Sequence, residues 1–290
     1  MVTVESTPRR IALDVLGLLV LPILLGAIHA FVPPAVEESL ILRPGDVTLL
    51  TMFTAAFFHL GLDHLVGNVT GYVIAAGYAY LLALILGERR WFWASTITLV
   101  LGLPVLVNWT SIQVMNAVLG GWVAPIRGFS GISAGFAGLA FVAVLVFVRD
   151  RIDLRSAFFI GLALILLLLW EILLIYSDSF PTIGTAATLV GIGLALLDVI
   201  GRAYYRGLPT GRGWQPVIRG IIVVGWMAAV LSVLVAGMFP ADLVIGGRFT
   251  NIFAHAAGFG YGVAITGWGF RYWQRRPTLR ELWQASLQKP

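Results

Sequence analysis

The stretch APIRGFSGISAGFAGLAF, residues 124–141, combines the two features that decide the fold and raise the question of function. It opens a long apolar run, which is typical of a helix that crosses a membrane. The run begins with a serine, Ser130, that lies between Gly128 and Gly131. A hydroxyl group and bare backbone at the start of such a helix need a physical reason, because polar groups are costly in hydrocarbon.

The composition of the whole chain indicates a membrane protein. Of its 290 residues, 59% are hydrophobic and only 11% are charged, whereas a soluble domain carries about 25% charged residues. The mean hydropathy is +0.92. The chain contains no cysteine, which excludes disulfides, thiolate metal sites and a cysteine nucleophile. We therefore expect an all-α polytopic membrane protein.

Eight apolar stretches are long enough, or nearly so, to cross the bilayer as helices, which takes about 17–25 residues. We take residues 1–270 as one transmembrane domain and residues 271–290 as a cytoplasmic or interfacial tail. The predicted spans are Ile11–Phe31, His64–Leu86, Trp91–Val107, Gly131–Val148, Ser156–Tyr176, Ile183–Ile200, Ile221–Met238 and Asn251–Gly269.

The basic residues are distributed unevenly between the two sides that these spans define. With the N-terminus inside, 16 of the 19 basic residues lie in inside connections, and only Arg43, Arg127 and Arg248 lie outside. Because cytoplasmic loops carry an excess of Lys and Arg, this bias predicts that both termini are cytoplasmic. The basic pI of about 9.9 is then a consequence of topology, and we predict a lipid bilayer and no nucleic acid as the surroundings.

Four polar side chains are predicted to meet just below the outer surface. Ser130 starts the fourth span, His255 lies near the start of the eighth, and His64 and Asn68 begin the second. All three spans run inward, so the four side chains share one depth. Histidine is the usual base that activates a serine nucleophile. His64, Asn68 and the Ser130 backbone N–H can donate hydrogen bonds to an anion.

Each of these residues also has a structural interpretation. Small residues in membrane helices usually serve close packing, which suits Gly131 as well as the small-xxx-small pair Gly258 and Gly262. A lone histidine near a membrane interface is often a structural hydrogen-bonding group. The combination of serine, histidine and two further donors at one depth favours a catalytic site.

Three motifs together resemble those of the rhomboid intramembrane serine proteases. They are GFSG at 128–131, AHAAGFGYG at 254–262 and HLGLDHLVGN at 59–68. All three occur in the order that the family shows, and the resemblance covers roughly residues 50–270. It implies a rhomboid-like core of six helices, to which this chain adds about two spans near residues 183–238.

The resemblance also implies roles for individual residues. Ser130 matches the nucleophile, His255 matches the general base, and His64 with Asn68 matches the pair that stabilises the oxyanion. The Ser130 N–H is a third oxyanion donor. Supporting roles fall to His59, Gly128, Gly131, Gly258 and Gly262. Rhomboids need no third acidic residue, and we expect the intramembrane acid Glu171 to form a structural pair instead.

Two positions depart from the family pattern. The Trp-Arg pair of the first outer loop is missing between Val32 and Phe58, where this chain has ILRPGD. The aromatic residue that many members carry four residues after the serine is replaced by Ala134. Phe129 and Phe136 are the candidates to contact the histidine in its place.

The resemblance implies an intramembrane serine endopeptidase without cofactor or metal, which cleaves transmembrane segments of other membrane proteins near the outer leaflet. It implies a prokaryotic cell membrane, with the active site toward the extracytoplasmic side. We expect the loop from Asn108 to Gly128 to help admit water. Two alternatives stay open: a haem-binding membrane redox protein that uses two of the four histidines, and a catalytically inactive rhomboid-like protein that binds membrane proteins.

Overall fold

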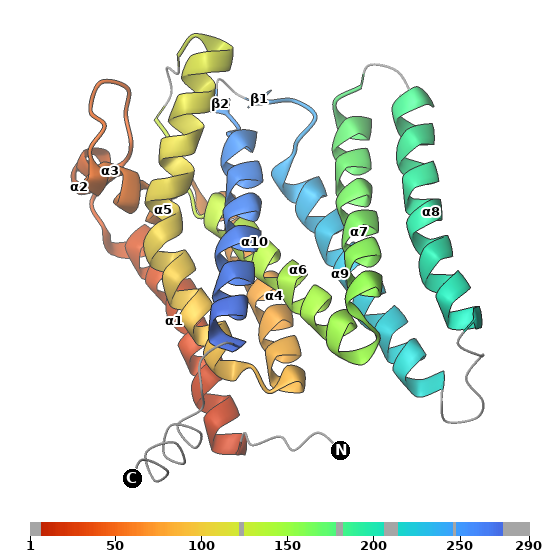
Figure 1. Ribbon diagram of the computed structural model, residues 1–290. Coiled ribbons are helices and arrows are strands. Elements are labelled where there is room, and N and C mark those ends of the chain that lie inside the picture. The colour runs from red at the N-terminus through yellow and green to blue at the C-terminus, as the bar shows by residue number, and fades with distance from the viewer. Residues whose placement is uncertain (1–6, 122–124, 178–181, 206–213, 246–247, 275–290) are drawn as a thin grey trace, which may run out of the picture.

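Long helices that run alternately in opposite directions make up most of the protein (Figure 1). The computed structural model describes residues 7–121, 125–177, 182–205, 214–245 and 248–274. The elements of this part are α1 (Pro8–Phe31), α2 (Pro34–Leu40), α3 (Leu49–Thr54), the 3-10 helix η1 (Ala55–Phe57), α4 (Leu62–Leu86), α5 (Arg89–Leu119), α6 (Ser130–Arg151), α7 (Leu154–Ile175), α8 (Thr182–Tyr205), α9 (Trp214–Met238), β1 (Val244–Ile245), β2 (Arg248–Phe249) and α10 (Ile252–Gln274).

Seven of these helices, α1 and α4 to α9, are long and apolar enough to cross a membrane. The fold is therefore that of a polytopic helical membrane protein. The eighth stretch, predicted at Asn251–Gly269, forms α10 and runs in the same direction as α4 and α6 (Figure 1). It is not among the seven, because glycines, a histidine and a tyrosine dilute its apolar residues. The predicted tail at 271–290 lies outside the described residues beyond Gln274.

Helix α5 is longer than the sequence predicts. The third span was expected to end at Val107 and to be followed by a loop from Asn108 to Gly128, but the helix continues to Leu119. The extra turns contain no glycine, and Ile112 packs in a small apolar cluster with Leu42 and Met52. Packing of the extra turns against the connection between α1 and α4 therefore keeps them helical, and Gly120, with φ of 70°, ends the helix.

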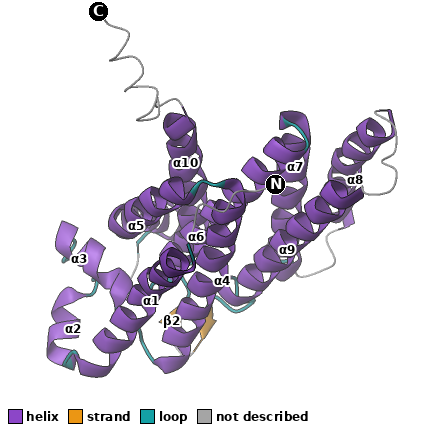
Figure 2. Cartoon of the chain, turned by 90° about the horizontal axis from the view of Figure 1, so that it is seen from below, coloured by secondary structure: helices purple, strands orange, loops and turns teal. Residues whose placement is uncertain are grey.

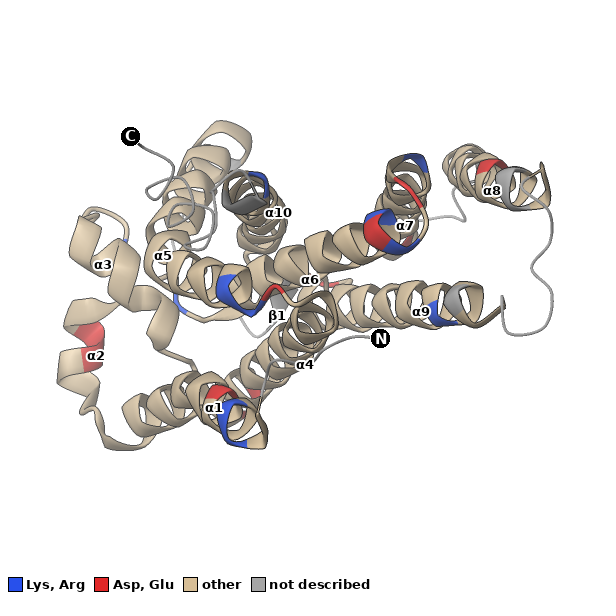
Figure 3. Ribbon diagram, turned by 60° about the horizontal axis from the view of Figure 1, so that its bottom comes forward, with Lys and Arg blue, Asp and Glu red and all other residues tan. Residues whose placement is uncertain are grey.

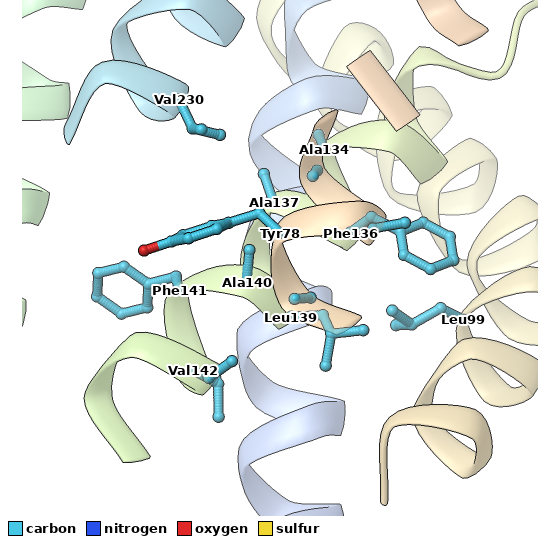
Figure 4. Close-up of a cluster of buried hydrophobic side chains, with 14 of the residues drawn as sticks. Tyr78, Leu99, Ala134, Phe136, Ala137, Leu139, Ala140, Phe141, Val142 and Val230 are labelled. Carbon is cyan, nitrogen blue, oxygen red and sulfur yellow. The ribbon is translucent and has the colours of Figure 1, made fainter. Parts of the chain in front are cut away.

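Helix α6 lies at the centre of the bundle. In its most apolar window 94% of the residues are buried inside the protein, compared with 11% for α1 and for α8. Figure 2 shows α4, α5, α7, α9 and α10 around it. Its apolar side chains pack against Tyr78 of α4, Leu99 of α5 and Val230 of α9, as the close-up in Figure 4 shows.

Glycine allows α6 and α10 to approach closely enough for their backbones to touch. A Cβ atom added at Gly258 would lie 1.9 Å from the carbonyl oxygen of Gly131, and one added at Gly262 would lie 2.2 Å from that of Gly135. No side chain fits at such distances, so the small-residue pattern does serve helix packing. The same contact places the start of α10 beside the start of α6.

The two spans predicted as additional, α8 and α9, lie in different environments. Helix α8 packs mainly on α7, at the edge of the bundle in Figure 1, whereas α9 packs against α6, α7 and α4. Glu171 of α7 accepts a hydrogen bond of 2.5 Å from Ser232 of α9. The structural pairing expected for Glu171 is therefore present, and it joins α7 to the helix that reaches the core.

The N-terminal part of α1 is attached to α4 and α5 through the buried residue Asp14. Asp14 is 3% exposed. It accepts two hydrogen bonds from Arg89, one from Tyr80 and one from Trp93. Figure 3 turns this end of the bundle forward and shows arginines at the ends of α1, α7, α9 and α10. It is the end that the distribution of basic residues in the sequence predicts to be cytoplasmic.

The connection that follows α1, residues 32–58, folds as α2, α3 and η1. The ILRPGD segment turns at Gly45, with φ of 83°, and Leu42 pairs with Ile126 through two backbone hydrogen bonds. The Gly128 N–H donates to the carbonyl of Ala55 at 3.1 Å. Without a Trp-Arg pair, this connection still holds the segment that precedes Ser130.

Candidate active site

Ser130 and His255 are joined by a hydrogen bond. Ser130 is the first residue of α6, and His255 is the fourth residue of α10. The Oγ atom of Ser130 lies 2.8 Å from Nε2 of His255. The glycine contact between α6 and α10 sets this register. The Asn251 side chain accepts from the Ala254 N–H at 3.2 Å and caps the start of α10 beside the histidine.

The second nitrogen of the His255 ring has no acidic partner. Nδ1 makes no hydrogen bond of normal geometry among the residues that the structure describes. The side chain is 5% exposed, and the ring meets that of Phe239 edge to face. Phe129 and Phe136, the candidates to contact the histidine, pack elsewhere. Phe129 packs on Phe57 and Tyr72, and Phe136 packs on Tyr72.

His64 and Asn68 lie on one face of α4 beside Gly128. A Cβ atom added at Gly128 would lie 2.7 Å from Cε1 of His64 and 3.5 Å from Nδ2 of Asn68. Gly128 has φ of 127°, which an L side chain rarely adopts, so both its backbone and its surroundings require glycine. Nδ2 of Asn68 is buried and lacks a hydrogen-bond partner in the described parts of the chain. It is a donor available to a ligand in this pocket.

His59 holds the segment that directly precedes α6 by a hydrogen bond. Its Nε2 accepts the Phe129 N–H at 3.4 Å, which is one of the N–H groups that α6 itself leaves without a partner. The His59 side chain is 4% exposed, and its ring lies 5.2 Å from that of His64. Burial is the main cause that lowers the pKa of His59 to about 3. The imidazole is therefore neutral at physiological pH and able to accept this hydrogen bond.

Ser133 attaches α4 to α6 one turn below Ser130. It is fully buried, and its Oγ donates to the backbone carbonyl of Asn68 at 3.0 Å. This bond holds the backbone of α4 at the residue whose amide faces the pocket. The sequence showed Ser133 only as one small residue among several, so its contact was not foreseen.

A cavity of about 940 Å³ joins these groups. Ser130, His255, His64 and Asn68 all line it. Residues of α9, such as Leu234 and Met238, form part of its apolar wall, and further polar lining comes from Asp63, Asn108, Arg127 and Asn251. The hydroxyl, the imidazole and the two candidate donors therefore face one space that is large enough for part of a peptide.

No protein-family model matches the chain, and neither the curated proteins nor the solved structures searched contain a match.

The four polar residues that the sequence places at one depth meet in the structure, whereas Phe129, Phe136 and Glu171 lie elsewhere. Ser130 and His255 are in contact, and His64 and Asn68 line the same cavity. Gly128 lies against His64, His59 holds the Phe129 N–H, and Gly131, Gly258 and Gly262 form the helix contact. Among the described residues, no group of three or more His, Cys, Asp or Glu side chains is arranged to hold a metal ion. Phe239 was not foreseen, because its contact depends on where α9 ends.

Proposed function

We propose that this protein is an intramembrane serine endopeptidase of the rhomboid type, which hydrolyses peptide bonds in or next to transmembrane segments of other membrane proteins. The observation that carries the proposal is the 2.8 Å hydrogen bond between Ser130 and His255, two residues 125 positions apart in the chain. Because the pair lies where inward-running helices begin, the scissile bond would be cut near the extracytoplasmic leaflet. On this proposal α10 is the eighth span.

The dyad supplies both proton transfers of peptide hydrolysis. His255 takes the Ser130 proton on Nε2 while Oγ attacks the carbonyl carbon, and the imidazolium then protonates the departing amine. Water next attacks the acyl-enzyme while His255 takes a proton from it, and the imidazolium returns this proton to Oγ as Ser130 leaves, which gives a carboxylic acid product. Nδ1 of the resting ring must carry the proton, since Nε2 has to accept.

The negative charge of the tetrahedral intermediate requires donors that are already in place. The N–H of Ser130 belongs to the first turn of α6, where N–H groups lack intrahelical partners. His64 and the free amide of Asn68 lie beside Gly128, and all three residues line the same cavity as Ser130. One such donor typically lowers the barrier by about 2.7–4 kcal/mol.

The test combines labelling with cleavage. The detergent-solubilised chain is treated with a fluorescent fluorophosphonate, and cleavage of a reporter with one transmembrane segment is followed in liposomes. Ser130→Ala is expected to abolish both, and His255→Ala to be nearly as damaging. Ser156→Ala, a buried serine at the start of α7, is the matched control and keeps both activities.

Each rival has its own outcome. Cleavage at the wild-type rate by Ser130→Ala would overturn the proposal. Absence of labelling and cleavage in the wild type, with the reporter retained by the purified protein, would support an inactive binder. A Soret band that persists in Ser130→Ala and disappears in His255→Ala would indicate the haem protein.

A further inference from the structure

An ion pair lies at the edge of the cavity, outside the three motifs. Arg127 lines the cavity that contains Ser130, and its guanidinium donates to the carboxylate of Glu37 on α2. The Arg127 side chain is 14% exposed and that of Glu37 is 24% exposed. A pair buried to this extent is poorly screened by solvent, so its two charges act over the neighbouring part of the site.

Arg127 is placed beside the candidate oxyanion donors. It directly precedes Gly128, whose Cα faces the His64 ring, and the guanidinium interacts electrostatically with that ring. Its Nε is buried and has no hydrogen-bond partner within the described ranges. A permanent cation therefore stands next to the place where negative charge is expected to develop.

We propose that Arg127 stabilises the oxyanion through its positive charge, and that Glu37 reduces this effect by partial neutralisation. The inference rests on the proposed function. A fixed charge in a partly buried site needs no reorganisation during the reaction, which is the condition for efficient electrostatic stabilisation. Glu37 opposes the transition state by the same rule, because it is the nearest counter-charge to Arg127 that the structure shows.

A second ion pair on α2 provides a matched control. Glu38, the next residue along, pairs with Arg43. Both of these side chains are more exposed, at 48% and 41%, and neither lines the cavity. Figure 3 shows the two acidic residues side by side on α2. Changes at Glu38 and Arg43 disturb the same short helix without altering the charge beside Ser130.

The experiment measures the second-order rate constant for fluorophosphonate labelling of the full chain in detergent. Arg127→Gln is expected to lower this rate about fivefold, and Glu37→Gln, which keeps an acceptor for Arg127, to raise it about threefold. Arg127→Lys keeps the charge and loses less than Arg127→Gln. The double variant labels faster than Arg127→Gln, because the charge of Glu37 opposes the oxyanion whether or not the arginine is present. Glu38→Gln and Arg43→Gln leave the rate unchanged.

Arg127→Gln and Glu37→Gln are expected to change the labelling rate in opposite directions. This difference distinguishes a charge effect from a purely structural role of the ion pair. If the ion pair only held α2 against the segment before Ser130, Arg127→Gln and Glu37→Gln would both lower the labelling rate or both leave it unchanged. Either result overturns the inference. If Arg127→Gln fails to fold, as judged by its thermal unfolding, Glu37→Gln alone decides, since only a charge effect makes it faster. A wild-type chain that is not labelled at Ser130 overturns the proposed function itself.

Discussion

The ring of Phe239 meets the ring of His255 edge to face, with centroids 5.7 Å apart and planes inclined at 73°. Phe239 directly follows α9, whereas Ser130 and His255 belong to α6 and α10. Ser130 is the side-chain hydrogen-bond partner of the imidazole in the described structure, and the backbone of Met238 lies close enough to interact with the same ring. The Phe239 ring adds a packing contact that helps to orient the imidazole, a task that an acidic residue performs in a catalytic triad.

Replacement of Phe239 tests this orienting role. Phe239→Ala is expected to slow fluorophosphonate labelling about tenfold and to change its pH profile, because the histidine ring gains freedom and solvent. Phe239→Tyr retains the ring and most of the rate. Phe158→Ala, on the outer surface of α7 with 64% exposure, is the control for loss of an aromatic. A Phe239→Ala protein with wild-type rate and pH profile would contradict the assignment.

The shared depth of the motif residues could be predicted from the sequence, because helical geometry decides where they lie. Once three inward-running helices were recognised, Ser130, His255, His64 and Asn68 had to share one depth. Phe239 could not be predicted in this way, since it lies beyond the end of a helix whose neighbours depend on tertiary packing. Phe129 was a reasonable candidate by position, but it packs against Phe57 and Tyr72 instead.

The composition of α10 and the length of α5 both depend on contacts with other segments of the chain. Helix α10 packs on α6 and α5, so its glycines serve contact and its polar residues serve the site. For the same reason α5 extends to Leu119, because its last turns rest on the connection that holds Leu42 and Met52. The sequence pattern of one segment does not contain such contacts.

Gly258→Ala is expected to be severely destabilising. The new methyl group would lie 1.9 Å from the carbonyl oxygen of Gly131, so α6 and α10 would have to separate, at a cost of about 3 kcal/mol. Thermal unfolding in detergent measures this loss, and labelling of Ser130 should fall with it. Gly260→Ala is the matched control on the same helix, because its methyl group would meet nothing within 4 Å. Equal stability of the two variants would show that the helix contact is not as close as described.

Asn68→Ala is expected to slow labelling and cleavage about 100-fold while leaving a residual rate. The variant removes one donor from the oxyanion site, whereas His64 and the Ser130 N–H remain. Its fold should persist, because the Ser133 hydroxyl bonds to the backbone carbonyl of Asn68 and not to its side chain. The measurement is the rate in protein whose unfolding temperature matches the wild type. A rate within twofold of the wild type would remove Asn68 from the mechanism.

Asp14→Ala is expected to loosen α1 without direct effect on the chemistry. The carboxylate receives hydrogen bonds from Arg89, Tyr80 and Trp93, and its loss leaves these donors unpaired at a cost of about 2 kcal/mol. The unfolding temperature of Asp14→Ala should fall accordingly, and that of Asp14→Asn should lie between those of the wild type and Asp14→Ala. Asp150→Ala, whose ion pair with Arg149 is exposed, should change stability by less than about 0.5 kcal/mol. If Asp14→Ala and Asp150→Ala lost the same amount of stability, Asp14 would not anchor α1.

Protonation of His59 links stability to pH. The pKa of His59 is about 3 in the folded protein, mainly because of burial and then because of His64 and His29, whereas an unfolded histidine has a pKa near 6.5. Between these values the unfolded chain binds more protons than the folded protein. The stability that neutral His59 contributes to the fold is therefore fully present above about pH 6.5 and decreases as the pH falls toward 3. From pH 7 to pH 5 the loss amounts to about 2 kcal/mol. Thermal unfolding at both pH values should show a smaller decrease for His59→Gln, which retains an acceptor for the Phe129 N–H but does not titrate. The same decrease in both proteins would mean that His59 does not stay neutral in the fold.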